Sequence, residues 1–152
     1  MSTDPYIKKI PHRPPFLFVD QVVDLQEGSI KTQRILRADE DFFSGHYPGN
    51  PLMPGVLLCE AVFQSAAILL VHRLESEGVS TEGKTPVLAR ILEAKFKNMA
   101  RPGDLLEIEV TWKEAIKNFQ FLRGVIRCDG KLVLTVNFAL ALLDESQAGS
   151  GV

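Results

Sequence analysis

The chain places a histidine and a glutamate where they could act as an acid–base pair. His46 lies in the loop 45–55, which contains three prolines and three glycines. Prolines restrict the backbone and glycines allow sharp bends, so we expect this loop to hold a defined shape. Glu60 follows near the start of an apolar helical stretch. An imidazole in a stiff loop and a carboxyl group near the start of a buried helix are suited to removing and delivering a proton.

The stretch that follows the loop predicts one long helix. From Val56 an apolar helical pattern continues for about twenty residues, or roughly 30 Å at about 1.5 Å per residue. Because its first half is apolar on nearly every side, we expect it inside the core. Glu60 and Gln64 lie one turn apart on one face of it. A buried carboxyl group is costly, so either a partner satisfies Glu60 or a raised pKa lets it hold and deliver a proton.

The same stretch does not predict a membrane span. Residues 56–71 are hydrophobic, but Glu60 and Gln64 interrupt them, and they fall short of the roughly eighteen apolar residues that a span requires. Residues 1–9 contain no apolar signal region. We therefore expect a cytoplasmic protein without a membrane span.

Composition and charge favour one globular domain that does not bind nucleic acid. The chain has 152 residues, is 45% hydrophobic, carries a formal charge of −2 and has no basic run. Cys59 and Cys128 lack the spacing of metal ligands, so we expect free thiols and no metal site. We expect the domain to cover residues 1–144 and a flexible polar tail to cover residues 145–152.

Four short motifs follow one another along the chain. They are Pro11-His12-Arg13-Pro14-Pro15-Phe16-Leu17-Phe18-Val19-Asp20, the loop 45–55, Glu60-Ala61-Val62-Phe63-Gln64, and Ala94-Lys95-Phe96-Lys97 with Arg101-Pro102-Gly103-Asp104. In this order they resemble the (3R)-hydroxyacyl-acyl-carrier-protein dehydratases of dissociated fatty-acid synthesis, from about Ile10 to Leu143. In the related dehydratase/isomerase branch an Asp usually occupies the position of Glu60, so the glutamate favours the simple dehydratase.

This resemblance implies an α+β hot-dog fold, in which an antiparallel sheet wraps around one long central helix. The residue pattern agrees with it independently. Alternating or apolar runs predict strands at residues 19–25, 29–37, 87–97, 105–115, 119–128 and 132–143. Asp129-Gly130 predicts a tight hairpin between the last two strands.

The implied reaction removes water from a 3-hydroxyacyl thioester and gives a trans-2-enoyl thioester. It needs a base, an acid and donors for the charge that develops on the thioester oxygen. Neutral His46 would take the α-proton, and protonated Glu60 would donate to the departing hydroxyl group. By resemblance, the backbone N–H of Gly55 would bind the thioester oxygen, and Gln64 would orient the carboxyl group of Glu60. The base, the acid and the N–H donors suffice for this reaction, so no metal or redox cofactor is expected. The acyl group is carried on phosphopantetheine of a carrier protein.

The resemblance also implies a homodimer. A stiff loop that leads directly into a helix is poorly placed to fold its histidine back onto the acid of that helix. In the family, His46 of one protomer would face Glu60 of the other, which gives two sites per dimer. Family members also assemble as trimers of dimers.

A basic surface is expected near the site, because the acyl carrier protein is acidic. Lys95 and Lys97 point outward on a strand if Ala94 and Phe96 point inward, and Arg101 follows in the next turn. Basic side chains would speed and orient the encounter with an acidic partner. A solvated strand face without a partner explains the same pattern equally well.

Four other residues of interest are expected to have structural rather than chemical roles. His12 is expected to pack or cap, His72 to lie on the surface, and Met53 and Phe63 to line the core or an acyl tunnel. The chain departs from the family pattern at Arg90, Leu92 and Phe63. These departures leave the acid–base pair intact but affect the expected acyl length and carrier.

Three alternatives to the dehydratase stay open. A hot-dog acyl thioesterase could use the same scaffold, but it would need an acid placed to activate water and has no evident use for His46. An (R)-specific enoyl-CoA hydratase shares the chemistry in reverse. A non-catalytic acyl-binding subunit would keep the fold, although retained His46 and Glu60 argue against it.

Overall fold

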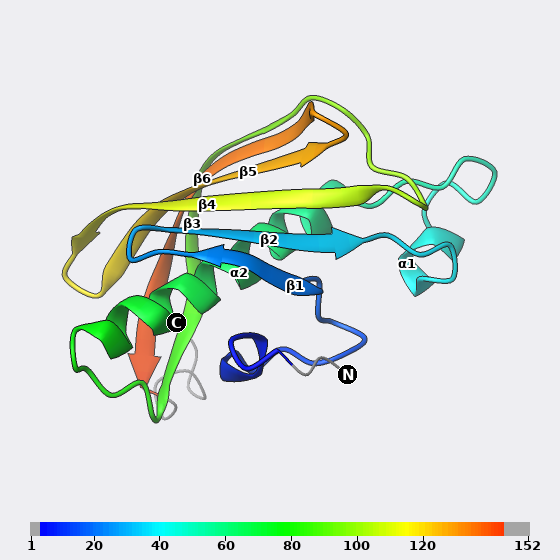
Figure 1. Cartoon of the computed structure of the whole chain (residues 1–152). Coiled ribbons are helices and arrows are strands. Elements are labelled where there is room, and N and C mark those ends of the chain that lie inside the picture. Colours follow the sequence, from blue (N-terminus) through cyan, green and yellow to red (C-terminus); the bar gives the residue numbers. More distant parts are fainter. Residues whose placement is uncertain (1–3, 145–152) are drawn as a thin grey trace.

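A computed structural model describes residues 4–144, which form one antiparallel sheet around one long helix (Figure 1). The sheet has six strands in the order β1-β2-β4-β5-β6-β3. The elements are η1 (Ile7–Lys9), β1 (Gln21–Leu25), β2 (Ser29–Ile35), α1 (Asp41–Ser44), α2 (Gly55–Ser76), β3 (Lys84–Phe96), β4 (Leu105–Ile116), β5 (Phe119–Cys128) and β6 (Lys131–Asp144). This arrangement confirms the predicted hot-dog fold.

Helix α2 fills the core beneath the sheet. Residues 61–71 of the helix are all buried, as the apolar pattern on every side predicts. Strand β4 alternates buried and exposed residues, so its inner side chains Leu106, Ile108 and Val110 join the core. Among the described residues, α2 is the one helix long and apolar enough to cross a membrane, but 72% of its most apolar window is buried inside the protein. The helix is therefore a core helix, in line with the sequence prediction.

The predicted strands correspond to β1–β6, and their ends differ by at most three residues. Asp129 and Gly130 form a two-residue turn between β5 and β6, with φ angles of 51° and 78°. Two positive φ angles give the backbone twist that a tight hairpin needs, so this prediction is confirmed. The short helices η1 and α1 were not predicted.

Among the strands that the structure describes, β3 lies at one edge of the sheet and pairs only with β6. Its pairing shifts register twice, between Leu88 and Arg90 and between Ile91 and Glu93. Four large apolar side chains on it are exposed, namely Leu88, Ile91, Leu92 and Phe96. An edge strand with unpaired backbone groups and an exposed apolar row is a surface on which another chain can add.

Two predictions concern the ends of the domain and the thiols. The tail at residues 145–152, which the sequence predicts to be flexible, lies outside the described residues, and the domain boundary stays a prediction. Both cysteines are free, Cys59 buried and Cys128 half-buried.

Candidate active site

His46 is held in one orientation by the loop that carries it. The ring is half-buried, and its Nδ1 lies 2.9 Å from the carbonyl oxygen of Leu52. A carbonyl oxygen can only accept, so in the neutral ring Nδ1 carries the proton and Nε2 has a free lone pair. The next residue, Tyr47, has a φ of 57°, which is a strained backbone conformation for a tyrosine. The loop therefore presents His46 with Nε2 ready to accept a proton.

Glu60 lies on α2, six residues into the helix counted from its start at Gly55. Its side chain is only 22% exposed. Burial raises the pKa of this carboxyl group, and the hydrogen bond donated by Gln64 acts in the opposite direction. A carboxyl group with a raised pKa keeps its proton at a pH where an ordinary glutamate has lost it, which suits a proton donor.

The side-chain amide of Gln64 makes three hydrogen bonds, two to the N-terminal segment at residues 16–18 and one to Glu60 on its own helix. Its side chain is fully buried. Oε1 accepts from the N–H of Phe18 at 2.7 Å. Nε2 donates to the carbonyl oxygen of Phe16 at 3.0 Å and to Oε2 of Glu60 at 3.0 Å. The amide thus fixes Oε2 of Glu60 as a hydrogen-bond acceptor.

His12 also contacts the acid, which sequence reasoning missed. Its Nε2 lies 3.5 Å from Oε2 of Glu60, and its Nδ1 is buried without a partner among the described residues. Burial first, and then the charge of Arg13, lower the pKa of His12. The expectation that His12 only packs or caps is therefore incomplete. The signal that could have found it is its place in the 11–20 motif, beside the segment that Gln64 holds.

The start of α2 offers unused backbone donors. Within residues 4–144 the N–H groups of Gly55 and Val56 have no hydrogen-bond partner, because the first turn of a helix lacks preceding carbonyl groups. The ring of Phe96 covers this position: a Cβ added to Gly55 would lie 2.9 Å from it. The helix dipole also favours negative charge here. This helix start can therefore bind an oxygen that gains negative charge.

The structure brings together some of the predicted site residues and separates one of them. Glu60 and Gln64 are in contact, and Gly55 begins the same helix. Within the described part of one chain, no contact joins the side chains of His46 and Glu60. No group of three or more His, Cys, Asp or Glu in residues 4–144 is arranged to hold a metal ion.

The predicted basic residues do not all face the same hollow. Lys97 and Arg101 line a hollow of about 500 Å³, and the structure adds Lys131 to them. Lys95 is exposed on β3 and pairs with Glu93 at 3.5 Å. Cys128 lines the same hollow, where burial, with help from nearby carboxylates, raises the pKa of its thiol to about 11. This thiol is therefore not a nucleophile at neutral pH.

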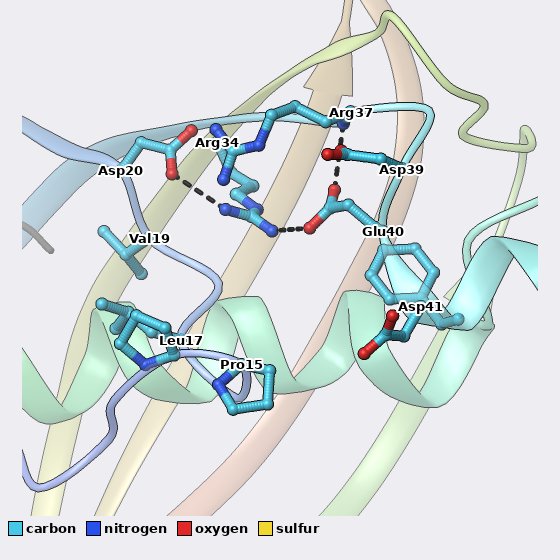
Figure 2. Close-up of a pocket in the computed structure, with 11 residues that line it drawn as sticks. Pro15, Leu17, Val19, Asp20, Arg34, Arg37, Asp39, Glu40 and Asp41 are labelled. Atoms are coloured by element: carbon cyan, nitrogen blue, oxygen red, sulfur yellow. Dashed lines mark hydrogen bonds and ion pairs between the residues drawn. The ribbon is translucent and has the colours of Figure 1, made fainter.

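A second hollow, of about 470 Å³, lies beside the segment before α1 (Figure 2). Figure 2 shows Arg34 between Asp20 and Glu40, and Arg34 donates to a carboxylate oxygen of each. Glu40 in turn accepts from the backbone N–H of Arg37. These contacts tie the end of β2 to the segment that leads into the His46 loop. The hollow includes neither His46 nor Glu60, and its buried guanidinium serves to position the loop.

The fold and the site define a hot-dog protein that carries a carboxyl group on its central helix and a histidine on the loop before it. The FabA-like domain family matches residues 10–137, so the chain belongs to this family.

Curated proteins named as dehydratases are similar to this chain over most of its length. The chain is 39% identical to the 3-hydroxyacyl-[acyl-carrier-protein] dehydratase FabZ of Caulobacter vibrioides, over 91% of this chain and 86% of that protein. It is 40% identical to the FabZ proteins of Granulibacter bethesdensis, over 93% and 82% of the two chains, and of Rhodospirillum rubrum, over 91% and 86%.

Solved structures share the fold at lower identity. The dehydratase heterocomplex ApeI:P from Xenorhabdus doucetiae matches with a TM-score of 0.75 and 16% identity, over 97% of this chain and 96% of that one. A hypothetical thioesterase with coenzyme A from Streptococcus pneumoniae matches with a TM-score of 0.62 and 14% identity, over 82% and 85%.

Proposed function

We propose that the protein removes water from (3R)-3-hydroxyacyl thioesters on an acyl carrier protein and forms trans-2-enoyl thioesters, as a hydro-lyase of fatty-acid synthesis. The observation that carries this proposal is the environment of Glu60. Its carboxyl group is half-buried, its pKa is raised by that burial, and one of its oxygens accepts a hydrogen bond from Gln64. The relatives named FabZ support the same activity.

Each step of the reaction has a group to perform it. Nε2 of His46 takes the α-proton of the substrate, and Glu60 gives its proton to the β-hydroxyl group, which leaves as water. The electrons of the broken C–H bond form the new carbon–carbon double bond. Negative charge develops on the thioester oxygen, and the free N–H of Gly55 binds that oxygen. Gln64 orients the acid, and the acyl group arrives on phosphopantetheine without a further cofactor.

The catalytic site is completed by a second copy of the chain. Among residues 4–144 of one chain no contact joins His46 to Glu60. Strand β3 forms an edge of the described sheet and carries exposed apolar side chains. Two copies joined along β3 bury this row, and each then supplies His46 to the Glu60 of its partner. The dimers can assemble further as trimers of dimers. The enzyme works in the cytoplasm. The acyl carrier protein docks on the hollow lined by Lys97, Arg101 and Lys131, which we call the basic hollow because its three basic side chains outnumber its two carboxylates.

The first experiment measures which product is formed. Purified protein receives 3-hydroxyacyl thioesters on carrier protein and on coenzyme A, and enoyl formation is recorded beside thiol release. We expect enoyl product with wild-type protein and none with His46→Ala or Glu60→Gln. Thiol release would indicate a thioesterase. Bound acyl ligand without turnover would indicate an acyl-binding subunit, and a rate confined to coenzyme A esters would indicate a hydratase.

A complementation experiment tests the shared site. His46→Ala and Glu60→Gln proteins are each inactive, but in a mixed dimer one site keeps both wild-type residues. After unfolding and refolding an equal mixture, we expect about a quarter of wild-type activity, because half of the dimers are mixed and each has one intact site. Absence of recovered activity, with mixed dimers demonstrated by mass spectrometry, would place the acid and base in the same chain.

A further inference from the structure

The acid of the site has two nitrogen neighbours on the same oxygen. Oε2 of Glu60 lies 3.0 Å from Nε2 of Gln64 and 3.5 Å from Nε2 of His12. The orientation of the Gln64 amide follows from its other bonds, since its Oε1 accepts from Phe18 and its Nε2 donates to Phe16. Gln64 therefore donates to Oε2 and cannot accept from it.

The position of the proton on His12 follows from burial. Nδ1 of His12 is buried and has no partner among the described residues. A proton on Nδ1 would be a buried donor without an acceptor, which is rarer and more costly than an unused lone pair. The neutral ring therefore carries its proton on Nε2, facing Glu60. The lowered pKa of His12 agrees with a neutral ring.

The segment that carries His12 is braced so that the ring stays in place. The guanidinium group of Arg13 donates to the carbonyl oxygens of His12 and Ile10, each at 2.6 Å, and to that of Lys8 at 3.2 Å. Further along, Gln64 holds Phe16 and Phe18. His12 thus lies on a turn fixed at both sides, and its side chain is only 25% exposed.

We propose that His12 is a positioning residue for the proton donor: its Nε2–H and the amide of Gln64 hold Oε2 of Glu60 as an acceptor, so that the catalytic proton is carried on Oε1. This inference rests on the proposed function, in which Glu60 is the acid. When Glu60 gives up its proton, the carboxylate that forms is stabilised by both donors. The 3.5 Å contact shortens as that negative charge develops. The two donors therefore stabilise the transition state more than the bound substrate, so they raise kcat more than they lower KM.

If His12 positions Glu60, removing its N–H should change how the reaction rate depends on pH. The charged or titratable groups that face His12 and Glu60 are Arg13, beside His12 on the N-terminal segment, and Cys59, beside Glu60 on α2. Arg13 donates to backbone carbonyl groups. Burial first, and then the charge of Glu60, raises the pKa of the Cys59 thiol, so this thiol stays uncharged near neutral pH. Removing an N–H donor destabilises the ionised form of Glu60 and raises its pKa further. The alkaline side of the rate profile, where Glu60 must stay protonated, then moves to higher pH.

The test compares wild-type protein with His12→Phe, His12→Gln and Glu60→Gln. Phenylalanine keeps a ring without the donor, whereas glutamine returns an N–H at a similar distance. For His12→Phe we expect kcat to fall about tenfold with KM changed less than about twofold, and the alkaline limb to shift upward. His12→Gln should recover most of both changes. An unchanged limb in His12→Phe, or equal loss in His12→Gln, would overturn the role of His12.

Two controls keep the outcomes separate. A wild-type protein that forms no enoyl product, or a Glu60→Gln protein at full rate, would overturn the proposed function itself. An active wild type, an inactive Glu60→Gln and an unchanged His12→Phe would overturn only the role of His12. If His12→Phe does not fold, the ¹⁵N chemical shifts of the His12 ring in wild-type protein test the proposal instead. A proton on Nε2 would support it, and a proton on Nδ1 would contradict it.

Discussion

Nε2 of Gln64 lies 3.0 Å from Oε2 of Glu60, and through this contact a fully buried amide connects the acid to the N-terminal segment. The same amide bonds the backbone of Phe16 and Phe18. The orientation of the acid and the docking of that segment are therefore one structural arrangement. A substitution at either end should affect both.

Gln64→Leu removes the amide while keeping the approximate volume. It leaves the buried N–H of Phe18 and the part-buried carbonyl oxygen of Phe16 without their partner, so we expect a loss of about 1–3 kcal/mol in the free energy of unfolding, measured with urea. We also expect a lower kcat. Gln33→Leu, on the half-buried outer side of β2, is the matched control and should change stability by less than about 0.5 kcal/mol. Equal stability of the two variants would contradict the structural role of the Gln64 amide.

Glu60→Gln should become more stable relative to wild-type protein as the pH rises. The pKa of Glu60 is raised in the folded protein above its ordinary value of 4.5, so folding is favoured when this group is protonated. That contribution is present below pH 4.5 and is lost as the pH rises through the folded-state pKa. Glutamine does not titrate. Urea unfolding at pH 4 and pH 8 measures the difference, and a gap between the two proteins that is constant with pH would contradict the raised pKa.

Gly55→Ala should impair catalysis without a matching loss of stability. The added Cβ would lie 2.9 Å from the ring of Phe96, so the ring or the helix start must move. The N–H that we propose to bind the thioester oxygen would move with the helix start. We expect kcat to fall about tenfold or more. Alanine at Gly49, where a Cβ meets nothing within 4 Å, is the control in the same loop. Partial recovery in Gly55→Ala combined with Phe96→Leu would assign the effect to this contact.

Charge reversal in the basic hollow should weaken the encounter with the carrier protein. Lys97→Glu and Lys131→Glu should each raise KM for carrier-bound substrate about fivefold to tenfold at low salt, with kcat unchanged. KM for the coenzyme A thioester should stay the same. Lys113→Glu on the exposed face of β4 makes the same change in net charge elsewhere. If all three variants behave alike, the hollow is a solvated surface and not the docking site.

Gly124 of β5 faces Val62 of helix α2. A Cβ at this position would lie 2.1 Å from the side chain of Val62, and both Gly124 and Val62 are buried. Gly124→Ala should therefore reduce the free energy of unfolding by about 1–3 kcal/mol. Val62→Ala in the same protein should restore part of that loss. Thermal and urea unfolding measure both, and additive losses in the double variant would contradict the proposed steric conflict.

The fold could be predicted from the sequence where a long periodic pattern was present. The helix and the strands have apolar residues at helical or alternating spacing, and Asp129-Gly130 marks its hairpin directly. Helices η1 and α1 span too few residues to show a period. Phe96 was expected to point inward, and its ring does cover Gly55, yet 51% of it stays exposed because β3 is an edge strand.

Some contacts of the candidate site could be predicted from the sequence and others could not, while the chemical roles of its residues stay predictions. The contact of Gln64 with Glu60 followed from helical spacing, because residues four apart share a face. The contact of His12 with Glu60 joins a loop to a distant helix, and no local pattern encodes such a pairing. Lys131 joins Lys97 in one hollow for the same reason, since Lys131 begins the neighbouring strand β6.

Because the N-terminal segment is attached to α2 by long-range contacts, the site should form later in folding than the sheet does. Strands β4, β5 and β6 are linked by short turns and can form early, because their contacts are local. The bonds from Gln64 to Phe16 and Phe18 span 48 and 46 residues of chain. Secondary structure can therefore return in a renatured chain while the proton donor is still unaligned. Recovery of turnover then lags behind recovery of the helical signal.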